Sequence, residues 1–107
     1  MSSLLAKQIL FARLLGRLIG FAYSQGYALT LGDGYRPDGN GHMKGSLHYV
    51  RLAQDLNLFI DGQWIKDGSH PAWLTLATFW KGLDPLCAAG YDFGDANHFS
   101  LMHEGKK

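Results

Sequence analysis

Two histidines and two aspartates in this 107-residue chain have the types and the spacing of a metal site. His48 follows a glycine-rich segment, and Asp55 lies seven residues later in an apolar run. A carboxylate buried in such a run needs a partner, because burying it unpaired is costly. A divalent cation would be one such partner, and a His48–Asp55 hydrogen bond without a metal would be another.

A second acid–histidine pair lies near the other end of the chain, in Asp95-Ala96-Asn97-His98. In a helical turn or a tight loop, groups three residues apart can face the same space. Catalytic zinc needs three protein ligands, an open position for water and a nearby carboxylate that takes the water's proton. His48, Asp55 and His98 would supply the ligands, and Asp95 is left over as the base. The alternative for Asp95 is a turn residue following Gly94.

These segments resemble the motifs of the zinc D-alanyl-D-alanine carboxypeptidase and L-alanyl-D-glutamate endopeptidase family, which includes VanX- and VanY-type enzymes and many phage endolysins. The likeness runs from about residue 18 to about residue 100, with the motifs in the family's order. The matching segments are Ala22 to Tyr27, Gly34-Tyr35-Arg36, Ser46-x-His48, Ala53-x-Asp55-Leu56 and Asp95-x-x-His98-Phe99.

The resemblance implies a role for each matched residue. His48, Asp55 and His98 would bind Zn²⁺, and Asp95 would be the general base. Arg36 would hold the substrate and the developing oxyanion, although an ordinary solvated arginine is the alternative. Ser46 would support the ligands from behind. The implied fold is an α+β domain with a small antiparallel sheet and flanking helices, like that of hedgehog domains and D-Ala-D-Ala peptidases, formed by residues 1–107 as a single catalytic domain.

Two residues depart from the family pattern. Arg51 stands where the family has a glycine, so the local backbone or a substrate contact differs. Asp95 stands where the dipeptidases have glutamate, and the phage endopeptidases often have aspartate there, which favours an endolysin that cuts the L-alanyl-D-glutamate bond. The alternatives are a D,D-carboxypeptidase acting on D-Ala-D-Ala and a non-catalytic zinc-binding module.

The same resemblance implies partners and a location. The substrate would be the peptidoglycan stem peptide, cut by a monomer for host lysis. A compact phage endolysin without a signal sequence would accumulate in the host cytoplasm until a holin releases it to the periplasm and the cell wall. The glycine-rich segment 37–45 would be a candidate lid over the cleft.

Composition is consistent with a soluble globular domain, because 47% of the residues are hydrophobic and 18% are charged. A net charge of +1 without a dense basic run does not favour a nucleic-acid partner. Cys87, the single cysteine, excludes an intramolecular disulfide and is expected to be buried. The apolar segment 4–23 has Arg13 and Arg17 in its middle, which predicts a helix that does not insert stably into a membrane.

Local signals predict the order of the elements. We expect a helix over 3–25, largely buried or with its basic side facing a membrane or a partner, and then a strand over 27–31. A loop follows over 32–45. The apolar run 48–60 predicts a strand that begins after His48, with a hairpin turn at Asp61-Gly62 and a return strand at 63–65. A second helix over 71–81 should end at Gly82, and one or two short strands should occupy 91–102.

The remaining histidines and the tryptophans carry weaker signals. His42, His70 and His103 lack partner spacing, and we expect them in a loop, beside a helix start and in the tail. Trp64, Trp73 and Trp80 are expected in the core or in a cleft wall rather than in a sugar-stacking platform.

Overall fold

The computed structural model describes residues 3–35 and 46–107. Its architecture is α+β, with a small antiparallel sheet and two α-helices, which confirms the expected class. In chain order the elements are α1 (Leu4–Ser24), β1 (Ala28–Leu31), the 3₁₀ helix η1 (Leu47–Val50), β2 (Ala53–Ile60), β3 (Gln63–Trp64), α2 (Pro71–Leu83), β4 (Cys87–Ala89), the 3₁₀ helix η2 (Gly90–Phe93) and β5 (His98–Leu101).

The long strand β2 organises the sheet. The strand order is β1-β2-β5-β4, and β3 also pairs with β2, always in the antiparallel sense. β2 and β3 form the expected hairpin around Asp61 and Gly62, whose φ angles of 51° and 77° are both left-handed. Such a pair of residues makes a two-residue turn whose twist matches that of the strands. β2 therefore contacts three other strands and runs through the middle of the molecule.

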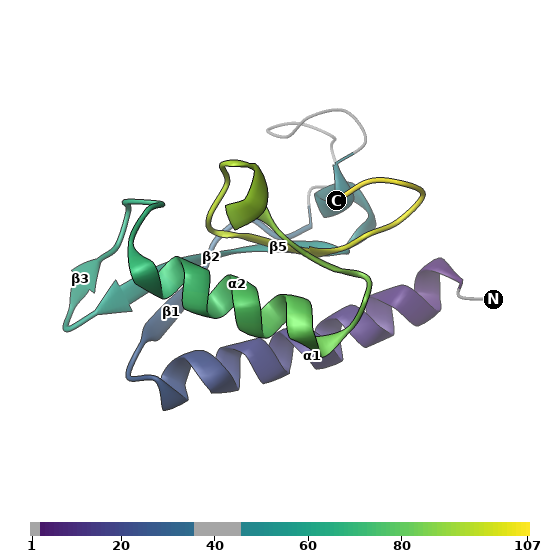
Figure 1. The fold of residues 1–107 in the computed structure, drawn as a ribbon. Coiled ribbons are helices and arrows are strands. Elements are labelled where there is room, and N and C mark those ends of the chain that lie inside the picture. Colours follow the sequence, from purple (N-terminus) through teal and green to yellow (C-terminus); the bar gives the residue numbers. More distant parts are fainter. Residues whose placement is uncertain (1–2, 36–45) are drawn as a thin grey trace.

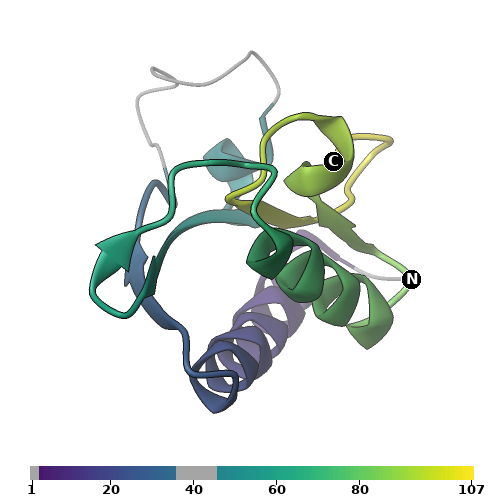
Figure 2. The ribbon, with the colours of Figure 1, turned by 60° about the vertical axis from the view of Figure 1, so that its left-hand side comes forward.

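The two α-helices lie on one side of the sheet. In Figures 1 and 2, α1 and α2 run below the strands, and η1 and η2 lie above them. The segment η1, which carries His48, thus lies across the sheet from the helices. A small domain built this way has its apolar core between the helices and the sheet and keeps the opposite face for chemistry.

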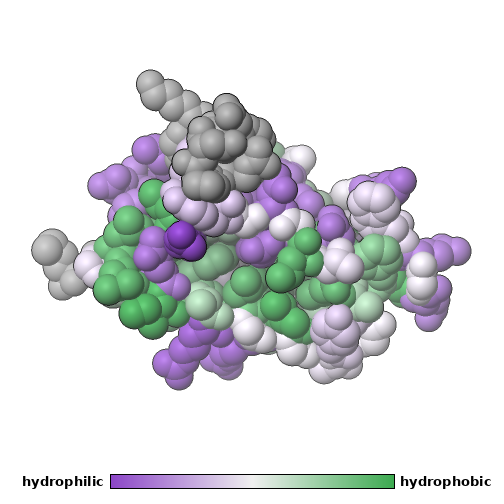
Figure 3. Space-filling view, turned by 180° about the vertical axis from the view of Figure 1, so that it is seen from behind, coloured by the Kyte–Doolittle hydropathy of each residue, from purple (hydrophilic) through white to green (hydrophobic). Residues whose placement is uncertain are grey.

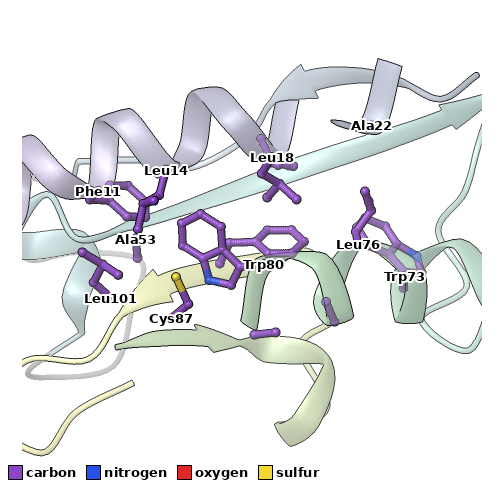
Figure 4. Packing of buried hydrophobic residues seen from close by; sticks show 14 of the residues in the cluster. Phe11, Leu14, Leu18, Ala22, Ala53, Trp73, Leu76, Trp80, Cys87 and Leu101 are labelled. Atoms are coloured by element: carbon purple, nitrogen blue, oxygen red, sulfur yellow. The ribbon is translucent and has the colours of Figure 1, made fainter. Parts of the chain in front are cut away.

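Trp80 of α2 is at the centre of the core. It is fully buried and makes edge-to-face contacts with Phe11 of α1 and Phe99 of β5, with centroid distances of 5.8 and 6.1 Å. Aromatic pairs prefer this offset geometry and add stability beyond the area they bury. Figure 4 shows Trp80 between α1 and the sheet, with Leu18 and Cys87 nearby.

The helix α1 buries one stripe of residues rather than most of its surface, so the expectation of a largely buried helix was wrong. Phe11, Leu14, Leu18 and Ala22 are the buried residues of α1, at the spacing of a single helical face. Leu5 and Ile9 are each 64% exposed, and Figure 3 shows apolar side chains on the surface near the N-terminal end. Within the described ranges, no helix combines the length and the apolarity needed to span a membrane.

The structure corrects two further expectations. The helix α2 continues through Gly82 to Leu83 and ends at Asp84, which is extended (φ −161°, ψ 145°). Asp84 precedes Pro85, and the proline ring disfavours the helical region for the residue before it. The strand β4 was not expected, because Cys87-Ala88-Ala89 carries no β-branched or aromatic residue. In the tail, β5 is the one strand inside the expected range 91–102.

Candidate metal centre

The register of two strands brings Asp55 and His98 together. They are direct partners in the antiparallel pairing of β2 and β5. Directly opposed residues have their Cβ atoms on the same face, about 4.5–5.5 Å apart. Asp55 and His98, 43 positions apart in the sequence, are thus placed side by side by the sheet itself.

His48 reaches the same point from η1, and β2 begins after it, as expected. The Ser46 hydroxyl accepts a hydrogen bond from the His48 backbone N–H at 3.2 Å and caps this short helix. Arg51 then ends η1 with φ 60°, a left-handed conformation in which glycine is favoured. The Arg51 guanidinium lies over the Tyr35 ring at 3.8 Å, a contact that a glycine could not make.

The loop before β5 fixes Asp95 relative to His98. The Asp95 N–H donates to the Gly90 carbonyl at 2.8 Å, and the His98 N–H donates to the Asp95 carbonyl at 3.0 Å. A Cβ at position 90 would overlap the Asp95 carbonyl and stand 2.7 Å from the His98 Cβ. Position 90 therefore requires glycine, because any side chain there would push His98 and Asp95 apart.

Three side chains converge in a buried cluster. The Asp55 Oδ1 atom lies 3.3 Å from His48 Nε2 and 3.5 Å from His98 Nδ1. The side chains of His48 and His98 are only 2% and 7% exposed, and that of Asp55 is 17% exposed. All three ligand atoms lie within 4.8 Å of one another, so this group could hold a metal ion.

Two atoms of the cluster, Asp55 Oδ1 and His98 Nε2, have no hydrogen-bond partner among the described residues. Four buried side-chain atoms lack a hydrogen bond among the described residues: Asp55 Oδ1, Trp73 Nε1, His98 Nε2 and Ser100 Oγ. Each such atom costs free energy unless something satisfies it. Because Asp55 Oδ1 faces both imidazoles, a cation between the three groups would satisfy it.

The charges of the cluster shift two pKa values. Burial opposes the charged form of Asp55, but the two imidazoles beside it outweigh burial and lower the pKa of Asp55 to about 2. Burial also disfavours a charged His48, yet the adjacent Asp55 carboxylate and the Gly34 carbonyl raise the pKa of His48 above its ordinary 6.5. The site thus attracts positive charge, and a proton competes there with a metal ion.

A backbone carbonyl orients His48. The His48 Nδ1 atom lies 2.8 Å from the Gly34 carbonyl oxygen, which can only accept, so Nδ1 carries a proton. In the neutral ring this leaves the lone pair on Nε2, the atom that faces Asp55. Histidines that bind metals commonly donate their other N–H to a carbonyl or a carboxylate in this way.

The donor set fits a tetrahedral metal. Zinc binds imidazole nitrogen and carboxylate oxygen at about 2.0–2.2 Å, which places tetrahedral ligand atoms about 3.4 Å from one another. The two Asp55 distances match this spacing, and the nitrogens of His48 and His98 lie within 4.8 Å of each other. Two nitrogens and one oxygen leave one tetrahedral position open for water.

Asp95 lies at the edge of the cluster and is accessible. Its Oδ2 atom is 3.9 Å from His98 Nδ1, and its side chain is 55% exposed. It also lines a surface pocket next to the cluster, so it can reach both the metal centre and a bound molecule. This combination of reach and exposure is what a general base requires.

The other predicted residues have separate locations. Arg36, the candidate oxyanion residue, and His42 fall outside the described residues, as does the lid candidate 37–45. His70 caps α2, accepting at Nδ1 from the Ala72 N–H, as its position beside a helix start suggested. The His103 Nδ1 atom lies 3.1 Å from Lys7 Nζ, away from the cluster.

Sequence reasoning missed three contributors to the site. The Gly34 carbonyl that orients His48 carries no sequence signal, because any residue has a carbonyl. Gly90 follows two alanines and looks like an ordinary turn glycine. Lys66 lines the pocket beside Asp95, and nothing in its local sequence indicates this. All three depend on contacts between distant segments.

Comparisons with known proteins add no family assignment. No family model matches the chain, and no curated protein matches it significantly. A function can therefore be inferred only from the geometry of the cluster and from the motif resemblance.

Proposed function

We propose that this protein is a zinc metallopeptidase that hydrolyses peptidoglycan stem peptides, with the fold of hedgehog domains and D-Ala-D-Ala peptidases. The observation that carries the proposal is the buried cluster of His48, Asp55 and His98, in which one Asp55 oxygen has no hydrogen bond among the described residues and Asp95 lies at the edge. The choice of zinc follows from the two imidazoles and one carboxylate. The choice of substrate follows from the motif resemblance.

Each residue has a defined task in this proposal. A bound zinc ion would supply a water of lowered pKa and polarise the scissile carbonyl. His48, Asp55 and His98 would hold the ion, with His48 kept in the correct tautomer by the Gly34 carbonyl. Asp95 would accept the water's proton and return it to the leaving amine. Arg36 would balance the charge of the tetrahedral intermediate.

The L-alanyl-D-glutamate bond is the preferred cleavage point, because aspartate at position 95 is the form that phage endopeptidases of the family often have. The protein would then be a phage endolysin that acts as a monomer. It would stay in the host cytoplasm until a holin opens the inner membrane and would reach the cell wall afterwards.

The first experiment measures the metal and the product together. The purified protein should contain about one zinc per chain by elemental analysis, and zinc-loaded protein should release new amino termini from purified sacculi. New D-glutamate amino termini support the endopeptidase. Free D-alanine instead would favour the D,D-carboxypeptidase. Zinc binding without any product would favour a non-catalytic zinc module.

Variants separate binding from catalysis. His98→Ala should lose zinc and activity together, and Asp95→Asn should keep zinc and lose activity by at least about 100-fold. His103→Ala is the matched control, because it removes a histidine that lies outside the cluster. Full activity of Asp95→Asn on sacculi would contradict the assigned base.

A further inference from the structure

A pocket of about 340 Å³ opens next to the metal centre. Its walls come from β2, the segment 64–68 and the segment 94–97, and Trp73 of α2 also lines it. The volume lies in the range of small-molecule sites. Because Asp95 belongs to both the pocket and the edge of the cluster, a molecule held in this pocket would lie beside the reacting bond.

Two tryptophans give the pocket its shape. Trp73 is 3% exposed and forms the base, whereas Trp64 is 53% exposed and forms the rim. The walls approach closely where a Cβ on Gly68 would stand 3.4 Å from the Ala96 Cβ. The Trp73 Nε1 atom is buried without a hydrogen-bond partner among the described residues, and Figure 4 shows this nitrogen on the side of the ring away from Trp80.

The pocket contains one cation. The Lys66 Nζ atom lies 4.6 Å from the centroid of the Trp64 ring, so the indole holds the ammonium at the pocket. Within the described ranges, no carboxylate forms an ion pair with Lys66, although Asp95 lines the same pocket. Among the described residues that line the pocket, Lys66 alone is basic, and it shares the pocket with the Asp95 carboxylate and the amides of Asn57 and Asn97.

We propose that this pocket is a substrate subsite for a carboxylate-bearing residue of the peptide, with Lys66 binding the carboxylate and Trp64 packing against the residue's carbon chain. The inference builds on the proposed peptidase function and defines its specificity. The D-glutamate of a stem peptide fits this chemistry, because its α-carboxylate stays free when its side-chain carboxyl forms the next peptide bond. Lys66 is then a specificity residue that selects the acid over the amide form.

The test compares two peptides that differ only in this group. One is an L-alanyl-D-glutamyl stem peptide with a free α-carboxylate, and the other is its α-amide. Wild-type protein should prefer the acid by about tenfold or more in kcat/KM, because a hydrogen bond to a charged group is being made. Lys66→Met should remove the preference, chiefly by raising KM for the acid, with little change for the amide.

Lys81→Met is the matched control. Lys81 is an exposed lysine of α2 that pairs with Asp92, and its removal changes the net charge of the protein by the same amount. This variant should keep the wild-type preference. A Lys66→Met protein that still prefers the acid, or a Lys81→Met protein that loses the preference equally, would overturn the subsite.

A binding measurement separates this inference from the proposed function. Amide chemical shifts of pocket residues are followed by NMR while the acid peptide, the α-amide peptide or sodium acetate is added to metal-free protein. Stronger binding of the acid peptide than of the other two supports the subsite even if sacculi are not digested. Equal binding of acetate and acid peptide indicates a non-specific anion site and overturns the inference. Digestion of sacculi without any acid preference would leave the proposed function intact and remove the subsite.

Discussion

The two ends of β5 differ in how their buried ring nitrogens are satisfied, although the Ser100 Oγ atom at the core end also lacks a hydrogen-bond partner among the described residues. At the C-terminal end of β5, here called the core end, the Trp80 Nε1 atom is buried and donates to the carbonyls of Ala88 and Ser100 at 3.0 and 3.2 Å. At the N-terminal end of β5, which carries His98 and is here called the metal-centre end, Asp55 Oδ1 and His98 Nε2 are buried without a hydrogen-bond partner among the described residues. Protein cores normally satisfy their polar groups, and exceptions concentrate at functional sites. The core end satisfies its buried indole N–H within the protein, whereas a cation at the other end could satisfy Asp55 Oδ1.

The largest effect on stability should follow from a substitution at the core end. Trp80→Ala removes a fully buried indole and leaves two carbonyls without their donor, so it should lower the free energy of unfolding by about 3–5 kcal/mol. Urea unfolding of metal-free protein measures this loss. Because Trp80 does not touch the cluster, the loss should be the same with zinc present. A loss that grows with zinc would contradict the separation of the two ends.

Gly90 tests the packing that holds the metal-centre end together. Gly90→Ala should lower stability by about 3 kcal/mol, at the upper end of overpacking effects, because the new methyl group overlaps the Asp95 carbonyl. It should also weaken zinc binding, since His98 must shift. Gly82→Ala is the control, because nothing lies within 4 Å of that position in α2 and alanine favours helix. Equal stability of the two variants would refute the role of Gly90.

Zinc should stabilise the metal-centre end specifically. At a free zinc concentration of 100 times Kd, the protein should gain about 2.7 kcal/mol, because only the folded state brings the three ligands together. Thermal unfolding with zinc and with a chelator measures the gain. Asp55→Ala should abolish it, and Trp80→Phe should retain it. A gain that survives in Asp55→Ala would place the ion elsewhere.

Low pH should lower the free energy of unfolding of the metal-free protein, because Asp55 becomes protonated. Its pKa is about 2 when folded and 3.8 when unfolded, so its contribution of about 2 kcal/mol is fully present above pH 3.8 and is lost as pH falls toward 2. The pKa of His48 is raised, so its contribution is present below pH 6.5 and disappears as pH rises through the folded value. Urea unfolding at several pH values should therefore show both slopes in wild-type protein, and both should be smaller in Asp55→Asn, which keeps the Gly34 contact of His48.

Local signals predicted the elements better than the contacts between them. The first helix, the hairpin at Asp61-Gly62 and the start of α2 at Pro71 were predicted correctly, because each depends only on nearby residues and backbone geometry. The strand β4 was missed because its pairing with β5, not its own residues, makes it a strand. Gly82 did not end α2, because the extended residue before Pro85 ended it instead.

The candidate site was predictable in identity but not in geometry. The spacing of His48, Asp55 and the Asp95-x-x-His98 segment indicated which residues to compare. The pairing of Asp55 with His98 depends on the β2–β5 register, which no local pattern specifies. The left-handed conformation of Arg51 gives a physical reason for the glycine of the family motif, and its contact with Tyr35 shows what the arginine adds.

The smallest expected effect is on the rate at which the Cys87 thiol, at the core end, reacts with an alkylating reagent. Burial, together with the charge of Asp84, raises the pKa of Cys87 to about 12, so almost no reactive thiolate exists near pH 8. Alkylation by iodoacetamide should therefore be slow in folded protein and fast in urea. Cys87 lies on β4, and β5 separates β4 from β2, the strand that carries Asp55. Zinc should therefore slow the alkylation of Cys87 only to the extent that it stabilises the whole fold. Mass spectrometry of timed samples measures both rates. In metal-free protein, Trp80→Ala should accelerate the alkylation of Cys87 far more than His98→Ala does. The reverse order would mean that the metal centre, rather than the aromatic core, keeps β4 in place.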